Sequence, residues 1–115
     1  MFKPFGLSVA MLCCQAAYAE TWFQVDGAGI NTALSGQHII YDNGHRQSFH
    51  SNGETEYSSG SQPSKGLWRV ENDLYCSQWP PQKDWDCYTV AFSDVQGRIL
   101  FTGIGGDQYF GRFTE

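Results

Sequence analysis

The stretch "YDNGHRQSFHSNGE", residues 41–54, holds two Asn-Gly pairs on either side of a short segment. Asn-Gly is favoured in the two-residue turns of β-hairpins, because both residues accept positive φ angles. The two pairs therefore predict one strand between two hairpins, with side chains that alternate between two faces. Gln47 and Phe49 point toward the predicted core. Arg46 and His50 point the other way.

Turn signals rich in Gly, Pro, Asn and Asp recur along the rest of the chain, and the segments between them are rich in aromatic and β-branched residues. This pattern predicts an antiparallel all-β domain, and no interval is long enough for the helical crossover of a parallel sheet. The predicted strands are residues 22–25, 37–42, 45–50, 54–58, 67–71, 74–79, 85–92, 98–103 and 107–113. A meander of about eight short strands must curl over its apolar face, as a small barrel or a two-layer sandwich, to hide its edges.

One short helix is predicted before the meander. Ile30 and Leu34 are apolar residues four positions apart, which is the spacing of one helical face, and Gly36 would end the helix.

The first residues have the layout of a secretory signal peptide. Lys3 gives a positive start, an apolar run follows from Phe5 to Ala17, and Ala17-Tyr18-Ala19 is a small-x-small cleavage pattern. The run is shorter than the roughly 20 residues that span a bilayer. The sequence therefore predicts a signal peptide at residues 1–19, a single all-β domain at residues 20–115 and a periplasmic or secreted location. A buried N-terminal helix is the alternative.

The charge of the mature chain limits its partners. Residues 20–115 contain six basic and twelve acidic side chains, a formal charge of −6. Nucleic acid is excluded as a partner, because phosphate binding requires a basic surface. The predicted partner is an unknown envelope protein, a peptide or a saccharide, and no transmembrane segment is predicted in the mature chain.

Two cysteines remain after the signal peptide is removed. Cys13 and Cys14 leave with it, and Cys76 and Cys87 stay. In an exported chain without another thiol, a disulfide is expected. The two residues would face each other across neighbouring strands, with Cα atoms within about 7 Å. Half of a metal site would instead require paired Cys-x-x-Cys spacing, which is absent.

An aromatic cluster surrounds this predicted disulfide. Tyr75, Trp79, Trp85 and Tyr88 lie close together in sequence, and Pro80-Pro81 stiffens the loop between the two tryptophans. A rigid aromatic patch suits a sugar, peptide or protein partner, so these four residues are the predicted binding site. In the alternative interpretation the rings are part of the core, or fold back to plug an open end of a barrel.

Residues 66–88 carry the most specific pattern in the chain. It reads Gly66-x-Trp68-x-Val70, Tyr75-Cys76-Ser77-x-Trp79-Pro80-Pro81 and Trp85-x-Cys87-Tyr88. The pattern resembles a group of small, generally uncharacterised exported proteins of Gram-negative bacteria, and the resemblance covers most of the mature chain. Some of these proteins carry the name dihydrodipicolinate reductase, which their size and composition do not support. The resemblance implies a periplasmic or secreted all-β domain with one disulfide, and it implies no catalytic residues.

No catalytic constellation is recognisable in the sequence. The Gly-x-Ser-x-Gly nucleophile elbow is absent. The glycines of "GIGGDQYFG", residues 103–111, lie between two predicted strands, where a hairpin turn is expected and a nucleotide site is not. Asp84 and Asp86 are typical of a solvated acidic surface. We therefore predict a non-catalytic binding or structural module of the cell envelope. The alternative is a small exported enzyme, a hydrolase or isomerase, with a site that the sequence does not reveal.

The histidines do not predict a metal site. His45 and His50 lie five positions apart and would project to opposite faces of one strand, while His38 belongs to the preceding strand. A zinc site requires at least three convergent protein ligands. We therefore predict no metal and no cofactor.

Overall fold

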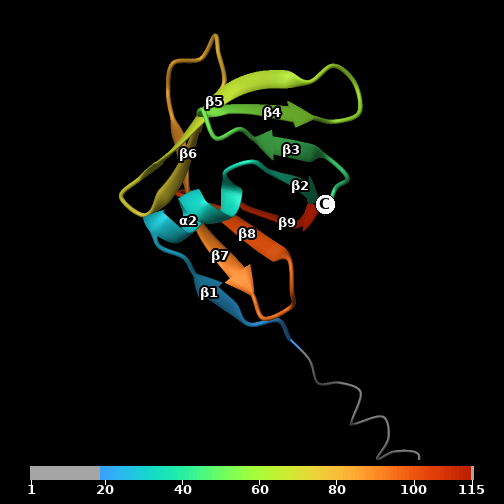
Figure 1. The fold of residues 1–115 in the computed structure, drawn as a ribbon, viewed down its shortest axis with the longest axis vertical. Coiled ribbons are helices and arrows are strands. Elements are labelled where there is room, and N and C mark those ends of the chain that lie inside the picture. Colours follow the sequence, from blue (N-terminus) through green and yellow to red (C-terminus); the bar gives the residue numbers. More distant parts are fainter. Residues whose placement is uncertain (1–18, 115) are drawn as a thin grey trace, which may run out of the picture.

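The computed structural model describes residues 19–114, which form nine strands and one α-helix (Figure 1). Residues 1–18, which include almost all of the predicted signal peptide, and residue 115 lie outside the described residues. The elements are β1 (Trp22–Gln24), α2 (Gly27–Leu34), β2 (Gln37–Tyr41), β3 (Arg46–Phe49), β4 (Glu54–Ser58), β5 (Ser64–Glu71), β6 (Leu74–Gln78), β7 (Asp86–Ser93), β8 (Arg98–Gly103) and β9 (Gln108–Thr114). The helix in this part of the chain is too short to cross a membrane.

The strands form a closed barrel. Strands β2 to β9 pair in chain order, each antiparallel to the next, and β9 pairs back onto β2. The eight strands therefore make an up-and-down barrel. A short ninth strand, β1, pairs with the end of β7, beyond the residues of β7 that pair with β6. The predicted all-β antiparallel fold is confirmed, and of the two predicted arrangements the barrel is the one observed.

The two Asn-Gly turns are longer than the two-residue turns that the sequence predicted. Gly44 N donates to Tyr41 O at 2.8 Å, and Gly53 N donates to His50 O at 3.0 Å. Gly44 and Gly53 have positive φ angles, and Asn43 and Asn52 do not. Within residues 19–114, the residues other than glycine with positive φ are Asn72 and Asp73, in a different turn. Both turns are thus three-residue hairpin loops that end on a left-handed glycine. The hairpins were predicted correctly and their turn type was wrong.

The predicted short helix is confirmed, but it begins earlier than Ile30. Asp26 precedes it, and the Asp26 carboxylate accepts a hydrogen bond from Gly29 N at 2.9 Å. Such an N-cap satisfies an amide that has no partner inside the helix. After Leu34 the chain leaves the helix and passes through Gly36, whose φ is 77°.

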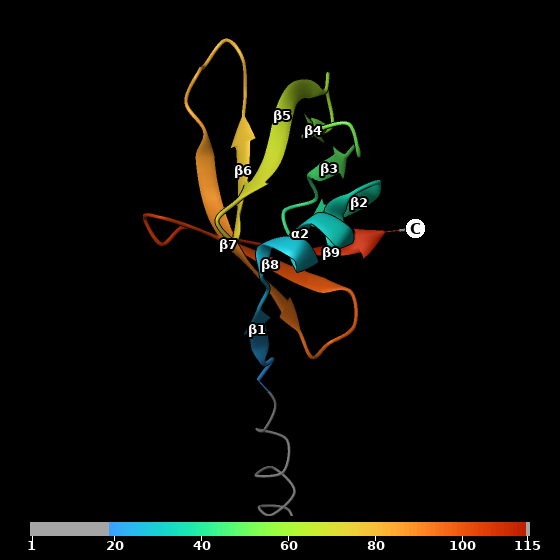
Figure 2. The ribbon, with the colours of Figure 1, turned by 60° about the vertical axis from the view of Figure 1, so that its left-hand side comes forward.

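Helix α2 closes one end of the barrel. Ile30 and Leu34 are fully buried and belong to the main core cluster. The start of the helix is held by the β5–β6 turn, where the Asp73 carboxylate accepts a hydrogen bond from Gly27 N at 2.7 Å. Figure 2 shows α2 beside the beginning of β6 and away from the β6–β7 loop. This end is therefore filled by helix side chains, and the opposite end is left to the loops.

Aromatic side chains fill the barrel next to the helix. Phe49 is fully buried and meets the rings of Trp68 and Tyr75 edge-on, with centroids 5.8 and 5.7 Å apart. The Trp68 indole donates to His50 O at 2.9 Å, so its polar atom is satisfied although the residue is buried. The inward orientation predicted for Phe49 is confirmed.

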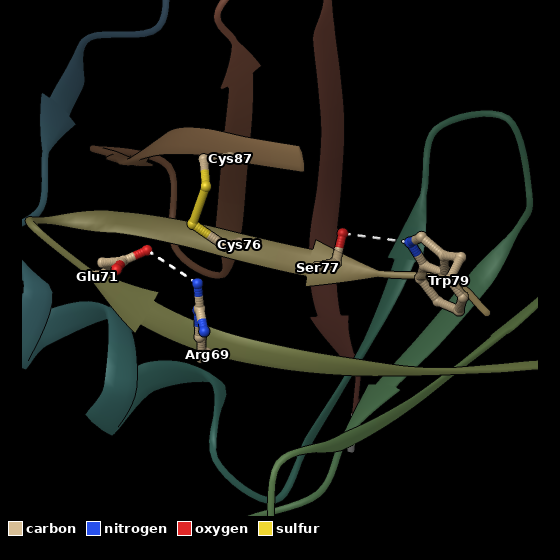
Figure 3. Close-up of a disulfide and its surroundings, with 6 residues drawn as sticks. All are labelled: Arg69, Glu71, Cys76, Ser77, Trp79 and Cys87. Atoms are coloured by element: carbon tan, nitrogen blue, oxygen red, sulfur yellow. Dashed lines mark hydrogen bonds and ion pairs between the residues drawn. A yellow bond between two sulfur atoms is a disulfide. The ribbon is translucent and has the colours of Figure 1, made fainter. Parts of the chain in front are cut away.

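A disulfide joins β6 to β7 on the outer face of the barrel (Figure 3). Cys76 and Cys87 are direct partners in the strand register, and Arg69 lies opposite Cys76 on β5. The predicted bond between these two cysteines is confirmed. It fixes the two strands from which the β6–β7 loop emerges.

Removal of this disulfide should destabilise the barrel. We expect the Cys76→Ala/Cys87→Ala double variant to lose about 3 kcal/mol of unfolding free energy, because the unfolded chain regains the freedom of the closed loop. Urea unfolding of both proteins measures the difference. Reduced wild-type protein keeps both sulfur atoms in place and is the matched control, which should lose a similar amount. Equal stability of oxidised and reduced protein would contradict the expectation.

Candidate binding cavity at the open end of the barrel

The end of the barrel opposite α2 is formed by loops. Antiparallel strands in chain order place every second connection at the same end. The connections at this end are residues 42–45, 59–63, 79–85 and 104–107. Inside them lies a cavity of about 330 Å³ that reaches down between the strands. We call this cavity the barrel cavity.

The barrel cavity is lined mainly by aromatic rings. Seven of its ten lining residues are aromatic, and none of the ten has a charged side chain. The aromatic residues are Tyr41, Tyr57, Tyr75, Trp79, Tyr88, Phe101 and Tyr109. The polar residues are Gln47, Ser64 and Ser77. Apolar walls with a few placed polar groups are typical of sites for small molecules.

A buried amide organises the floor of the cavity. Gln47 is only 5% exposed, and its side-chain oxygen accepts a hydrogen bond from the Tyr41 hydroxyl. Its side-chain nitrogen donates to Thr55 Oγ1 at 2.9 Å and to the Tyr75 hydroxyl at 3.1 Å. One glutamine therefore orients two of the lining phenols. Because buried polar groups are costly without partners, this network holds a single arrangement.

Trp79 forms part of the wall because β5 has a glycine beneath it. A Cβ atom at Gly66 would lie 2.6 Å from the Trp79 ring and 2.6 Å from the carbonyl oxygen of Gln78. The Trp79 indole donates to Ser77 Oγ at 3.2 Å (Figure 3). Its ring meets Tyr57 edge-on, at a centroid distance of 6.2 Å. Trp79 is thus turned inward over the barrel wall, and the space that it occupies exists because Gly66 has no side chain.

The lining phenols are held in their neutral form. Burial raises the pKa of Tyr41 and of Tyr75 well above the ordinary value. Burial, and to a smaller extent the negative charge of Asp86, raises the pKa of Tyr88 to about 12. The pKa of Tyr109 is raised chiefly by its hydrogen bond to the Asp107 carboxylate. At neutral pH these groups donate and accept hydrogen bonds, and they do not act as bases.

Three of the four predicted binding residues meet at this cavity. Tyr75, Trp79 and Tyr88 line it, and they come from β6, the loop after β6, and β7. Trp85 does not line it. The Arg69 guanidinium lies over the Trp85 ring at 4.0 Å, on the outer face beside the disulfide.

The other lining residues were not predicted from the sequence. Gln47 left a usable signal, because the alternation that places Phe49 inward also places a polar side chain on the core face. Tyr57 and Tyr109 belong to separate hairpins, and no local pattern connects them with Tyr88. The Tyr88–Tyr109 contact, with centroids 6.0 Å apart, is made across β8, the strand that lies between β7 and β9.

The three histidines lie in separate surroundings. His45 is hydrogen-bonded to the Tyr57 hydroxyl, and its ring meets Tyr57 edge-on at the mouth of the barrel. His50 is exposed, with Nε2 3.8 Å from a carboxylate oxygen of Glu56. His38 is exposed on β2. Over residues 19–114, no three His, Cys, Asp or Glu side chains converge in a way that could hold a metal ion.

Comparison with known proteins adds no assignment. No family model, curated protein or solved structure matches this chain. The resemblance of residues 66–88 to small exported proteins of Gram-negative bacteria therefore stays a prediction. What the barrel cavity can bind has to be inferred from its own geometry and chemistry.

Replacement of Gln47 tests the floor network. We expect Gln47→Leu to reduce the free energy of unfolding by about 1–3 kcal/mol, because buried hydroxyls lose their partner while the side-chain volume is nearly conserved. Urea unfolding followed by tryptophan fluorescence measures the change. Gln96→Leu, at an exposed turn position, is the control and should have little effect. Equal stability of the Gln47→Leu variant and wild type would mean that the network does not support the fold.

Alkaline pH should destabilise the fold through Tyr88. Its pKa is raised from 10.0, the ordinary value for tyrosine, to about 12 in the folded protein. Between these two values the unfolded chain loses its proton first, so the folded state binds more protons and stability falls as pH rises. Urea unfolding at a series of pH values from about 9 upward, around and beyond the ordinary tyrosine pKa, measures the slope. The Tyr88→Phe variant should show a smaller decline, and an identical slope in both proteins would contradict the assignment.

Proposed function

We propose that this protein is an exported, non-catalytic binding module that holds one small ligand in the barrel cavity. The observation that carries the proposal is the cavity itself, an opening of about 330 Å³ with seven aromatic lining residues in an otherwise packed barrel. Eight-stranded barrels have an interior that side chains just fill or that holds one small ligand. Here α2 and the rings around Phe49 fill the barrel at one end, and the cavity opens at the other end.

The size and chemistry of the cavity favour a small organic ligand. Its volume is at the lower end of the range of about 300–1,000 Å³ for ligand sites. Tyr and Trp offer apolar faces together with a polar atom, which suits a sugar ring, a peptide side chain or another compact organic group. The Gln47 network orders the floor before a ligand arrives, so that little side-chain entropy is lost on binding.

A periplasmic or secreted location is part of the proposal. It rests on the signal-like residues 1–19 and on the disulfide, because disulfides persist in oxidising compartments. A second surface for an envelope protein would lie on the outer side of the β6–β7 loop, where Trp85 stacks with Arg69.

The composition of the lining argues for binding over catalysis. A general acid or base works best when its pKa lies near the working pH. The lining contains no carboxylate, lysine, histidine or cysteine, and the pKa values of its buried phenols are raised away from neutrality. A small hydrolase or isomerase therefore finds less support in this cavity than a binding module does.

A neutral fluorescent probe tests the proposal. N-phenyl-1-naphthylamine should bind the full mature protein with one-to-one stoichiometry and with an increase in its fluorescence, because the cavity offers an apolar aromatic environment. Ser64→Trp places a bulky ring at a lining position and should abolish this binding.

The matched control is Lys65→Trp. Lys65 is the neighbouring residue on β5; it is exposed and its side chain alternates to the outer face. This variant should bind the probe as wild type does. Absence of probe binding to wild type, or undiminished binding to a folded Ser64→Trp variant, would overturn the proposal.

A further inference from the structure

Resting on the proposed function, we propose that the ligand of the barrel cavity carries a positively charged organic amino or ammonium group. This group would lie at the mouth, between the aromatic rings and the carboxylates of Asp86 and Asp107. The inference names the class of ligand, and four features of the mouth support it.

Asp86 stands at the rim of the barrel cavity. It begins β7 and is the register partner of Ser77, which lines the cavity. It precedes Tyr88 by two positions, so both side chains project from the same face of the strand. Its carboxylate is close enough to Tyr88 to contribute to the raised pKa of that phenol.

Asp107 approaches the same ring from the β8–β9 turn. A Cβ atom at Gly103 would collide with the Asp107 carboxylate, so this carboxylate occupies the side-chain space of Gly103. Gly103 is the register partner of Tyr88. Asp86 and Asp107 also line one polar groove of about 350 Å³, and Tyr88 belongs to both this groove and the barrel cavity. The ring of Tyr88 therefore separates the barrel cavity from the two carboxylates, and a ligand in the cavity that extends beyond this ring would meet both of them.

The rings of the mouth form corners. Tyr88 and Tyr109 meet at 75°, and Tyr57 and Trp79 meet at 77°. All four rings line the barrel cavity, so a group held at the mouth is surrounded by aromatic side chains. The face of an aromatic ring carries partial negative charge and attracts ammonium groups, most strongly where water is displaced.

Neither carboxylate of the mouth is held in an ion pair with a basic side chain of the described residues. Within residues 19–114 the salt bridges use Glu20, Asp42, Glu56 and Glu71, and neither Asp86 nor Asp107 takes part in one. Arg69 and Arg98 are engaged in those ion pairs. The mature chain also carries a formal charge of −6. The field at the mouth therefore favours a cation over an anion of the same shape.

Three soluble compounds of similar size test the inference. They are 2-phenylethylamine, a cation at neutral pH, 2-phenylethanol, which is neutral, and 3-phenylpropanoate, an anion. Isothermal titration at pH 7 and low salt should give the amine a dissociation constant about tenfold below that of the alcohol. The anion should bind more weakly than the alcohol.

Charge-removing variants locate the effect. In Asp86→Asn/Asp107→Asn the amine should lose most of its advantage, because its dissociation constant should rise much more than that of the alcohol. Glu54→Gln/Asp94→Asn removes the same formal charge from the closed end of the barrel, next to the β3–β4 and β7–β8 turns, and should keep most of the preference.

The outcomes separate the two proposals. If the alcohol or the anion binds as tightly as the amine, the cation inference is wrong and the cavity remains a binding site. If the amine preference survives in Asp86→Asn/Asp107→Asn, the proposed position of the charged group is wrong. If none of the three compounds binds, and the neutral fluorescent probe does not bind either, both the inference and the proposed function are overturned.

Discussion

The pairing of β9 with β2 is the contact on which the rest of the structure depends. Without it, eight strands in chain order would form an open sheet with two exposed edges and no interior. Gly111 makes this contact close, because a Cβ atom there would lie 2.8 Å from an Ile39 methyl group and 2.9 Å from the Ile40 carbonyl oxygen. Closure gives the chain an inside, and the alternation of each strand then decides which side chains enter it.

The interior is divided by the sizes of the inward residues. Next to α2 the strands contribute Phe49 and Trp68, and the barrel is full. Toward the other end they contribute Gly66 and Gly103, whose space is taken by side chains that arrive from the loops. The mouth is therefore built as much by loops as by strands. Its chemistry depends on residues that could change with little effect on the barrel core.

The fold was largely predictable because its signals are local. Turn residues mark the strand ends, and alternation identifies the inward face of Phe49. Strand β5 begins three positions before the predicted residue 67, since Ser64 pairs with Tyr57 across the sheet and has no strand signal of its own. The site was predictable only where alternation and the disulfide hold its residues together. Tyr57 and Tyr109 reach it from strands that are not adjacent to β6 or β7, through contacts across β5 and β8 that no local sequence pattern announces.

Both described chain ends lie at the end of the barrel that α2 closes. Trp22 pairs with Ser93 beside the β7–β8 turn, and Thr114 pairs with His38 at the start of β2. Anything fused or tethered to either end therefore attaches behind the molecule, and the mouth faces outward. A protein immobilised by a terminal tag would present its opening to the solution, and copies joined end to end would keep their openings accessible.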